Sequence, residues 1–96
     1  MALFACKVGG SQGVSINNLT AVSSGNSFTG VKNKYYIICG SGNANDRVSS
    51  VTNCNILSNA PVITQGSTGC ALVKCTANGS CTISHTFSYI RVFVVN

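Results

Sequence analysis

The chain has 96 residues, a net charge of +5 and one acidic residue, Asp46. A single carboxylate excludes reactions that need two acidic side chains, such as those of most glycosidases and of aspartic proteases. Charged residues make up 7% of the sequence, against about 25% in an ordinary soluble domain. The length predicts one domain over residues 1–96, and its polar, uncharged surface leaves little repulsion between copies of the chain.

Short runs rich in β-branched and aromatic residues alternate with Gly- and Asn-rich turns along the whole chain. Taken in order, the runs predict strands at 3–8, 14–22, 27–30, 34–39, 47–55, 61–64, 71–76, 81–87 and 89–95. No segment has the apolar spacing of a helix with caps at both ends. The pattern predicts an all-β fold, a single antiparallel β-sandwich or flattened barrel of seven to nine short strands.

Asn78 and Gly79 form the strongest turn signal in the chain. This pair is preferred in two-residue hairpin loops, because both central residues of such a loop need a positive φ. A hairpin with this turn would point the side chains of Cys75 and Cys81 to opposite faces of the sheet. The sequence therefore predicts that these two cysteines do not bond to each other.

The six cysteines lie at positions 6, 39, 54, 70, 75 and 81. Six in a short chain are typical of a secreted protein with a disulfide framework. However, Cys6 and Cys39 lie within apolar runs, where a reduced cysteine packs as a small hydrophobic residue. Reduced core thiols and two or three disulfides both remain open. The spacings are not the close pairs of zinc sites, so the sequence predicts no metal site.

The sequence predicts no catalytic residue, no cofactor and no small-molecule substrate. A nucleophile–base–acid triad would have to use His85 and Asp46, and His85 is more simply a polar strand residue. No glycine-rich loop ends in the Gly-Lys-Ser/Thr of a phosphate-binding loop. The cationic residues are scattered along the chain, and this scatter argues against a nucleic-acid partner. The one exception is a basic and aromatic cluster at 32–36.

No apolar run is long enough to cross a membrane, so no membrane insertion is predicted. Residues 1–5 lack the basic and apolar regions of a secretion signal. The sequence therefore predicts one of two origins. Either the protein is used in the cytoplasm where it is made, or Met1 has been added to a mature secreted protein.

The strand predicted at 89–95 is apolar on both faces. One face carries Ile90, Val92 and Val94, and the other carries Tyr89, Phe93 and Val95, interrupted by Arg91. A small sandwich needs one apolar face per sheet for its own core, and a second face with aromatic residues and an arginine has the composition of an interface centre. The candidate interface is therefore Tyr89, Arg91, Phe93 and Val95. The alternative is a central strand that the same chain covers on both sides.

Three segments have a recognisable residue composition: one rich in Ser, Thr and Gly, a short apolar one, and the ending of the sequence. They read LTAVSSGNSFTG at 19–30, YYII at 35–38 and YIRVFVV at 89–95. This residue composition resembles that of small β proteins of tailed-bacteriophage virions, which serve as head decorations, head fibres or tail parts. It contains no specific motif and so assigns no functional residue.

The resemblance implies a non-enzymatic structural or adhesion component of a phage virion, made in the host cytoplasm and assembled in many copies. Its partners would be itself, other virion proteins or both. The cysteine content and basic charge support an alternative, a secreted effector or toxin-like protein stapled by disulfides. The number of free thiols in the native protein separates these two hypotheses.

Overall fold

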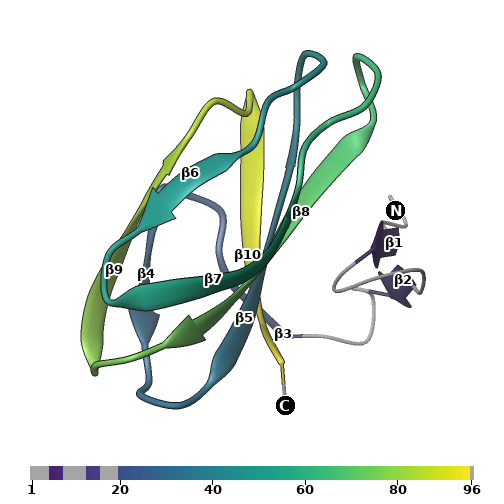
Figure 1. Cartoon of the computed structure of the whole chain (residues 1–96). Helices are drawn as coiled ribbons and strands as arrows, with labels where there is room; N and C mark the ends of the chain where they lie inside the picture. Colours follow the sequence, from purple (N-terminus) through teal and green to yellow (C-terminus); the bar gives the residue numbers. More distant parts are fainter. Residues whose placement is uncertain (1–4, 8–12, 16–19, 96) are drawn as a thin grey trace.

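The structure is a computed structural model that describes residues 5–7, 13–15 and 20–95 (Figure 1). All the regular secondary structure in this part of the chain is β-strand. The strands are β1 (Ala5–Lys7), β2 (Gly13–Ser15), β3 (Thr20–Ser23), β4 (Ser27–Gly30), β5 (Tyr35–Ser41), β6 (Val48–Val51), β7 (Cys54–Ala60), β8 (Thr68–Cys75), β9 (Gly79–His85) and β10 (Tyr89–Val95).

Two antiparallel sheets pack face to face. The larger sheet has the strand order β3-β10-β5-β8-β7, and the smaller sheet has the order β4-β9-β6. The strands β1 and β2 pair with each other beside the larger sheet, on the side away from the smaller sheet (Figure 1). The predicted all-β fold, an antiparallel sandwich of short strands, is therefore confirmed, although the described residues form ten strands and not seven to nine.

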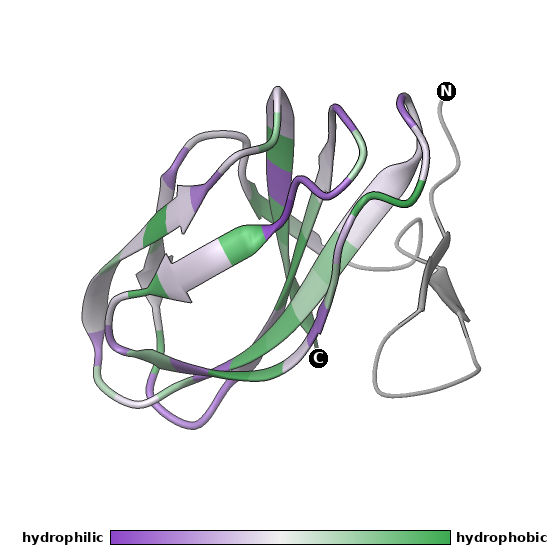
Figure 2. Ribbon diagram, turned by 45° about the horizontal axis from the view of Figure 1, so that its top comes forward, coloured by the Kyte–Doolittle hydropathy of each residue, from purple (hydrophilic) through white to green (hydrophobic). Residues whose placement is uncertain are grey.

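The core between the two sheets is built from apolar side chains of both. Its buried members are Phe28, Tyr36, Ile38, Val48, Val51, Val62, Ala71, Val73, Cys75, Cys81, Ile83, Phe87, Ile90, Val92 and Val94. Phe28 of the smaller sheet packs on Tyr36 of the larger sheet, with ring centroids 4.7 Å apart. Hydrophobic residues follow the strands and hydrophilic residues gather at the turns (Figure 2). Burial of this apolar layer is the main force that holds the sheets together.

Two glycines in the larger sheet make room for one aromatic ring. Gly40 in β5 pairs directly with Gly69 in β8. The ring of Phe87, from the connection between β9 and β10, lies against both glycines, and a Cβ at either position would run into it. The ring therefore occupies a slot that exists because both side chains are missing.

The outer face of the larger sheet, which points away from the smaller sheet, is also apolar at its centre. Ile37, Cys39, Cys70 and Phe93 are buried there, with Leu72 and Val95 packed against them. The strand β1 lies against β8 (Figure 1). Because the central strands β5, β8 and β10 are buried on both faces, their sequences are apolar almost without alternation.

Three predicted strands are divided or absent in the structure, and most of the others differ from it only in their bounds. The strand expected at 47–55 is two strands, β6 and β7, because the chain turns at Asn53, where φ is 59°, and crosses to the larger sheet. The strand expected at 61–64 does not form, because the backbone of Val62 bonds to the loop residues Asn45 and Asp46 instead. The strand expected at 14–22 appears as β2 and β3, and residues 16–19 lie outside the described part.

The predicted hairpin at Asn78 and Gly79 is wrong. The strand β8 pairs with β5 and β7 in the larger sheet, whereas β9 pairs with β4 and β6 in the smaller one. Both edges of β8 are therefore occupied, and the chain crosses between the sheets instead of turning back. Gly79 has φ 129° and pairs with Gly30 of β4. The predicted orientation of Cys75 and Cys81 toward opposite faces of one sheet is therefore wrong as well.

Candidate functional site

The outer face of the larger sheet carries the residues predicted as an interface. Residues that pair directly across β10, β5 and β8 share a face and form rows. The rows are Tyr89–Ser41–Thr68, Arg91–Cys39–Cys70, Phe93–Ile37–Leu72 and Val95–Tyr35–Lys74. The predicted division of the last strand into two apolar faces is confirmed, because Ile90, Val92 and Val94 lie in the core on the opposite side.

The four candidate interface residues divide into two groups. Phe93 is 6% exposed and Val95 is half-buried, so the same chain already covers this half of the strand. Tyr89 is 76% exposed and Arg91 is also exposed. The alternative of a strand covered on both faces therefore describes Phe93, while Tyr89 and Arg91 remain accessible to a partner.

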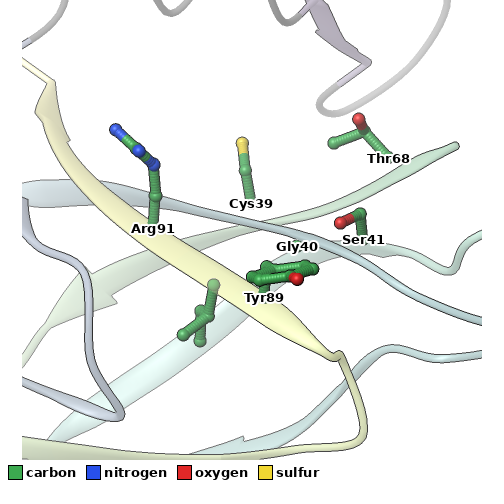
Figure 3. Close-up of a pocket in the computed structure, with 7 residues that line it drawn as sticks. Cys39, Gly40, Ser41, Thr68, Tyr89 and Arg91 are labelled. Atoms are coloured by element: carbon green, nitrogen blue, oxygen red, sulfur yellow. The ribbon is translucent and has the colours of Figure 1, made fainter. Parts of the chain in front are cut away.

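Tyr89 and Arg91 line a pocket at one end of the outer face (Figure 3). The other lining residues are Cys39, Gly40, Ser41, Thr68 and Ile90. The side chains of Arg91, Cys39 and Thr68 point to the same side of the sheet. The phenol ring supplies apolar area, the guanidinium supplies hydrogen-bond donors, and the hydroxyl groups can donate or accept. This mixture suits one polar or aromatic side chain of a binding partner.

The two residues considered for a triad have separate partners. His85 Nε2 lies 2.7 Å from Asn26 Oδ1, and the imidazole stacks on Phe87 with ring centroids 5.6 Å apart. The Asp46 carboxylate accepts a hydrogen bond from the backbone N–H of Asn43 at 2.8 Å. Both side chains therefore hold local structure.

The tyrosines of the basic cluster at 32–36 are engaged within the fold. Tyr36 lies in the core, and its hydroxyl accepts a hydrogen bond from the Val31 N–H at 2.9 Å. Tyr35 lies under Lys74, whose Nζ is 5.6 Å from the ring centroid. A buried ring such as that of Tyr36 cannot stack on a base, which is how single-stranded nucleic acids are held.

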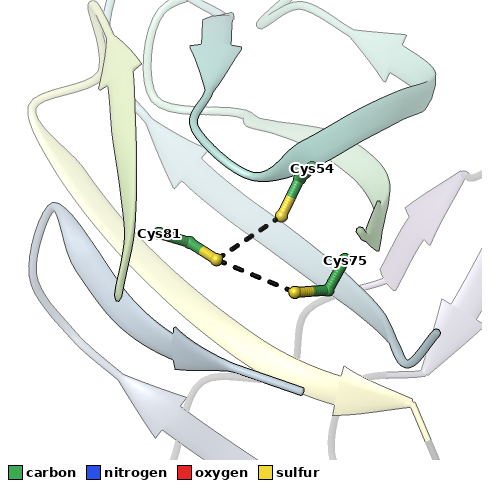
Figure 4. A group of neighbouring side chains, drawn as sticks. All are labelled: Cys54, Cys75 and Cys81. Atoms are coloured by element: carbon green, nitrogen blue, oxygen red, sulfur yellow. Dashed lines mark hydrogen bonds between the residues drawn. The ribbon is translucent and has the colours of Figure 1, made fainter. Parts of the chain in front are cut away.

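Three cysteines from three strands converge at the other end of the sandwich (Figure 4). Cys54 at the start of β7 pairs directly with Cys75 at the end of β8, and Cys81 faces them from β9. The Cys81 Sγ atom lies 3.7 Å from that of Cys54 and 3.9 Å from that of Cys75. All three sulfur atoms lie within 4.8 Å of one another.

The environment of Cys54 and Cys81 favours the protonated thiol. Cys75 and Cys81 are fully buried and Cys54 is half-buried. Burial raises the pKa of the Cys54 thiol, and the neighbouring Cys81 raises it further. Burial also raises the pKa of Cys81. Because the thiolate is the reactive form of cysteine, the thiols of Cys54 and Cys81 are poor nucleophiles at neutral pH.

The sequence did not predict this cluster. Within β8, Cys70 lies on the outer face and Cys75 in the core, so Cys70 does not join the cluster. Bringing Cys81 to Cys75 requires knowing that consecutive strands belong to different sheets. The spacing along the chain says nothing about Cys54, which joins the cluster from a third strand.

Comparisons with known proteins found no matching family model, no similar curated protein and no similar solved structure. Within the described residues there is no helix long and apolar enough to cross a membrane.

Proposed function

We propose that the protein is a non-enzymatic structural or adhesion component that works in many copies. In this proposal the protein is a capsid decoration or a tail part, as its resemblance to tailed-phage virion proteins implies. Its partners in this proposal are further copies of itself and other virion proteins, and its location is the virion.

The observation that carries the proposal is the uncharged state of the four edge strands. The edges of the two sheets are β3 (TAVS), β7 (CNILSNA), β4 (SFTG) and β6 (VSSV), and none contains Lys, Arg, Asp or Glu. Free proteins often place charges on sheet edges, because unpaired N–H and C=O groups there would otherwise pair with another chain. In this sandwich Lys74 and Arg91 instead lie on inner strands. Such edges favour contact between copies.

The exposed apolar residues support the same proposal. Tyr89 and Ile63 are each 76% exposed. They line neighbouring hollows that share Thr68, one formed by the ends of β5 and β10 and the other by the 60–68 segment. Large exposed apolar side chains beside one another are typical of protein–protein contact sites.

The test is the mass of the protein in solution, measured by light scattering over a range of concentrations. The wild type is expected to form oligomers at high micromolar concentration. Leu57→Lys places a charge on the β7 edge at a side chain that is 53% exposed, and it should lower the mass. Ala44→Lys adds the same charge to an exposed turn residue that lines neither hollow, and it should leave the mass unchanged. A monomeric wild type would refute assembly from copies of this chain.

One observation favours the alternative of a secreted, disulfide-stapled protein. Five of the six cysteines lie in two groups, Cys39 with Cys70 at 3.5 Å between sulfurs, and the cluster of Cys54, Cys75 and Cys81. Counting free thiols in the native, unreduced protein decides between the two. Six free thiols favour the virion component, and two or three disulfides favour the secreted protein.

A further inference from the structure

We propose that Cys54, Cys75 and Cys81 form a binding site for a soft metal ion, and that the ion it fits is Cu(I). The expectation that the chain has no metal site came from cysteine spacing along the sequence. The fold supplies what the spacing cannot, because it joins β7, β8 and β9 at one point between the sheets. The proposal is independent of whether the protein assembles.

The distances between sulfurs suit ligands of one ion. A disulfide holds its sulfurs about 2.05 Å apart, so 3.7 Å and 3.9 Å are too long for a bond. Two thiolates bound to one metal at about 2.3 Å lie about 3.8 Å apart at the tetrahedral angle, and slightly further apart around a three-coordinate ion. The separations to Cys81 therefore already match, and the third pair lies within the 4.8 Å limit.

The set of donors selects the kind of ion. Among the described residues, no histidine or carboxylate joins the three sulfurs. Structural zinc takes four protein ligands, and this site offers three. Thiolate donors favour soft ions, and Cu(I) is a soft ion that three thiolates can bind without a fourth ligand. Coordination replaces the thiol protons, which pass to solvent, and it changes no oxidation state when copper is supplied as Cu(I).

A loop with two lysines lies beside the cluster. Three thiolates with one Cu(I) carry a net negative charge, which needs compensation in a buried place. The loop that carries Lys32 and Lys34 bonds to this corner, since the Cys75 N–H donates to the Lys34 carbonyl at 2.9 Å. Asp46 lies in the connection after Ser41, at the opposite end of β5.

The cluster has an entrance and a fitted wall. Cys54 is half-buried on an edge strand, so an ion can reach it from solvent, while Cys75 and Cys81 are closed off behind it. Gly30 forms the wall, because a Cβ there would lie 2.5 Å from the Cys75 sulfur and 2.7 Å from the Cys81 sulfur. A side chain at position 30 would push the two sulfurs out of place.

The test is anaerobic titration of the reduced protein with Cu(I) in competition with a chromogenic Cu(I) chelator. The wild type is expected to withhold one equivalent from the chelator, with a thiolate-to-metal absorption band in the ultraviolet. Cys54→Ser, Cys75→Ser and Cys81→Ser should each abolish this equivalent. Gly30→Ala keeps all three sulfurs but crowds them, and it should weaken binding by about 10- to 100-fold, as residues that orient metal ligands do.

Cys70→Ser is the matched control, because it removes a buried cysteine from the outer face of the same sheet. It should leave the equivalent intact. If Cys70→Ser removes that equivalent and the three cluster variants keep it, the proposed site is wrong. Tighter binding of Zn²⁺ than of Cu(I) would overturn the choice of ion. Circular dichroism identifies any variant that fails to fold, and Cys54→Ser at the half-buried edge is the decisive variant in that case.

Discussion

Gly40→Ala tests whether the slot in the larger sheet determines how the sandwich closes. The added Cβ would overlap the Phe87 ring, which is 7% exposed and rests on Gly40 and Gly69. Removing a buried phenylalanine ring costs about 3–5 kcal/mol. The alanine displaces the ring without removing it, so the expected loss is that of overpacking, about 1–3 kcal/mol.

The measurement is urea unfolding followed by far-ultraviolet circular dichroism, for Gly40→Ala, Phe87→Ala and the double variant. Phe87→Ala should cost less in the Gly40→Ala background than in the wild type, because the ring is already displaced there. Gly25→Ala is the control, since nothing lies within 4 Å of its added Cβ. A Gly40→Ala stability within about 0.5 kcal/mol of the wild type would refute the slot.

Three further changes have defined outcomes. Burial raises the pKa of the Cys54 and Cys81 thiols in the folded protein. The stability that these thiols contribute should therefore be complete below the ordinary thiol pKa of 9.0 and should be lost as the pH rises above that value. Urea unfolding midpoints of the reduced, metal-free protein, measured on both sides of pH 9.0, check this expectation. Asn53→Ala should lower the stability by about 1–3 kcal/mol, because alanine is strained at φ 59° and cannot donate a hydrogen bond to the Ser80 carbonyl in β9. Asn53→Gly should be less destabilising than Asn53→Ala, because glycine relieves the strain but still lacks the hydrogen-bond donor. Tyr36→Phe should cost about 1–3 kcal/mol by leaving the Val31 N–H without its partner, and a melting temperature equal to that of the wild type would contradict this hydrogen bond.

Residue patterns within single strands predicted the fold class well. The short apolar runs identified the strands at 27–30 and 89–95 with the observed bounds, and the two faces of the last strand were assigned correctly. These properties depend on residues one or two positions apart, which the sequence displays directly.

The candidate sites depend on pairing between strands, which the sequence does not display. Asn78 and Gly79 show that the chain changes direction, but not whether β8 then pairs with β9 or leaves it for the other sheet. That choice is set by β5 and β7, which occupy both edges of β8. The burial of Phe93 likewise depends on its neighbours across the strands, Ile37 and Cys39 among them.

The position of β10 between β3 and β5 has a consequence for how the protein folds. Its pairing with β3 joins Thr20 to Val94, so the larger sheet stays in two pieces until nearly the whole described chain has left the ribosome. Folds built on such distant pairings form slowly, in milliseconds to seconds. During that delay β3 and β5 both present open, uncharged edges. Nascent chains on one polyribosome could exchange strands at this stage, so slower translation of the segment that encodes β10 should increase aggregation during synthesis.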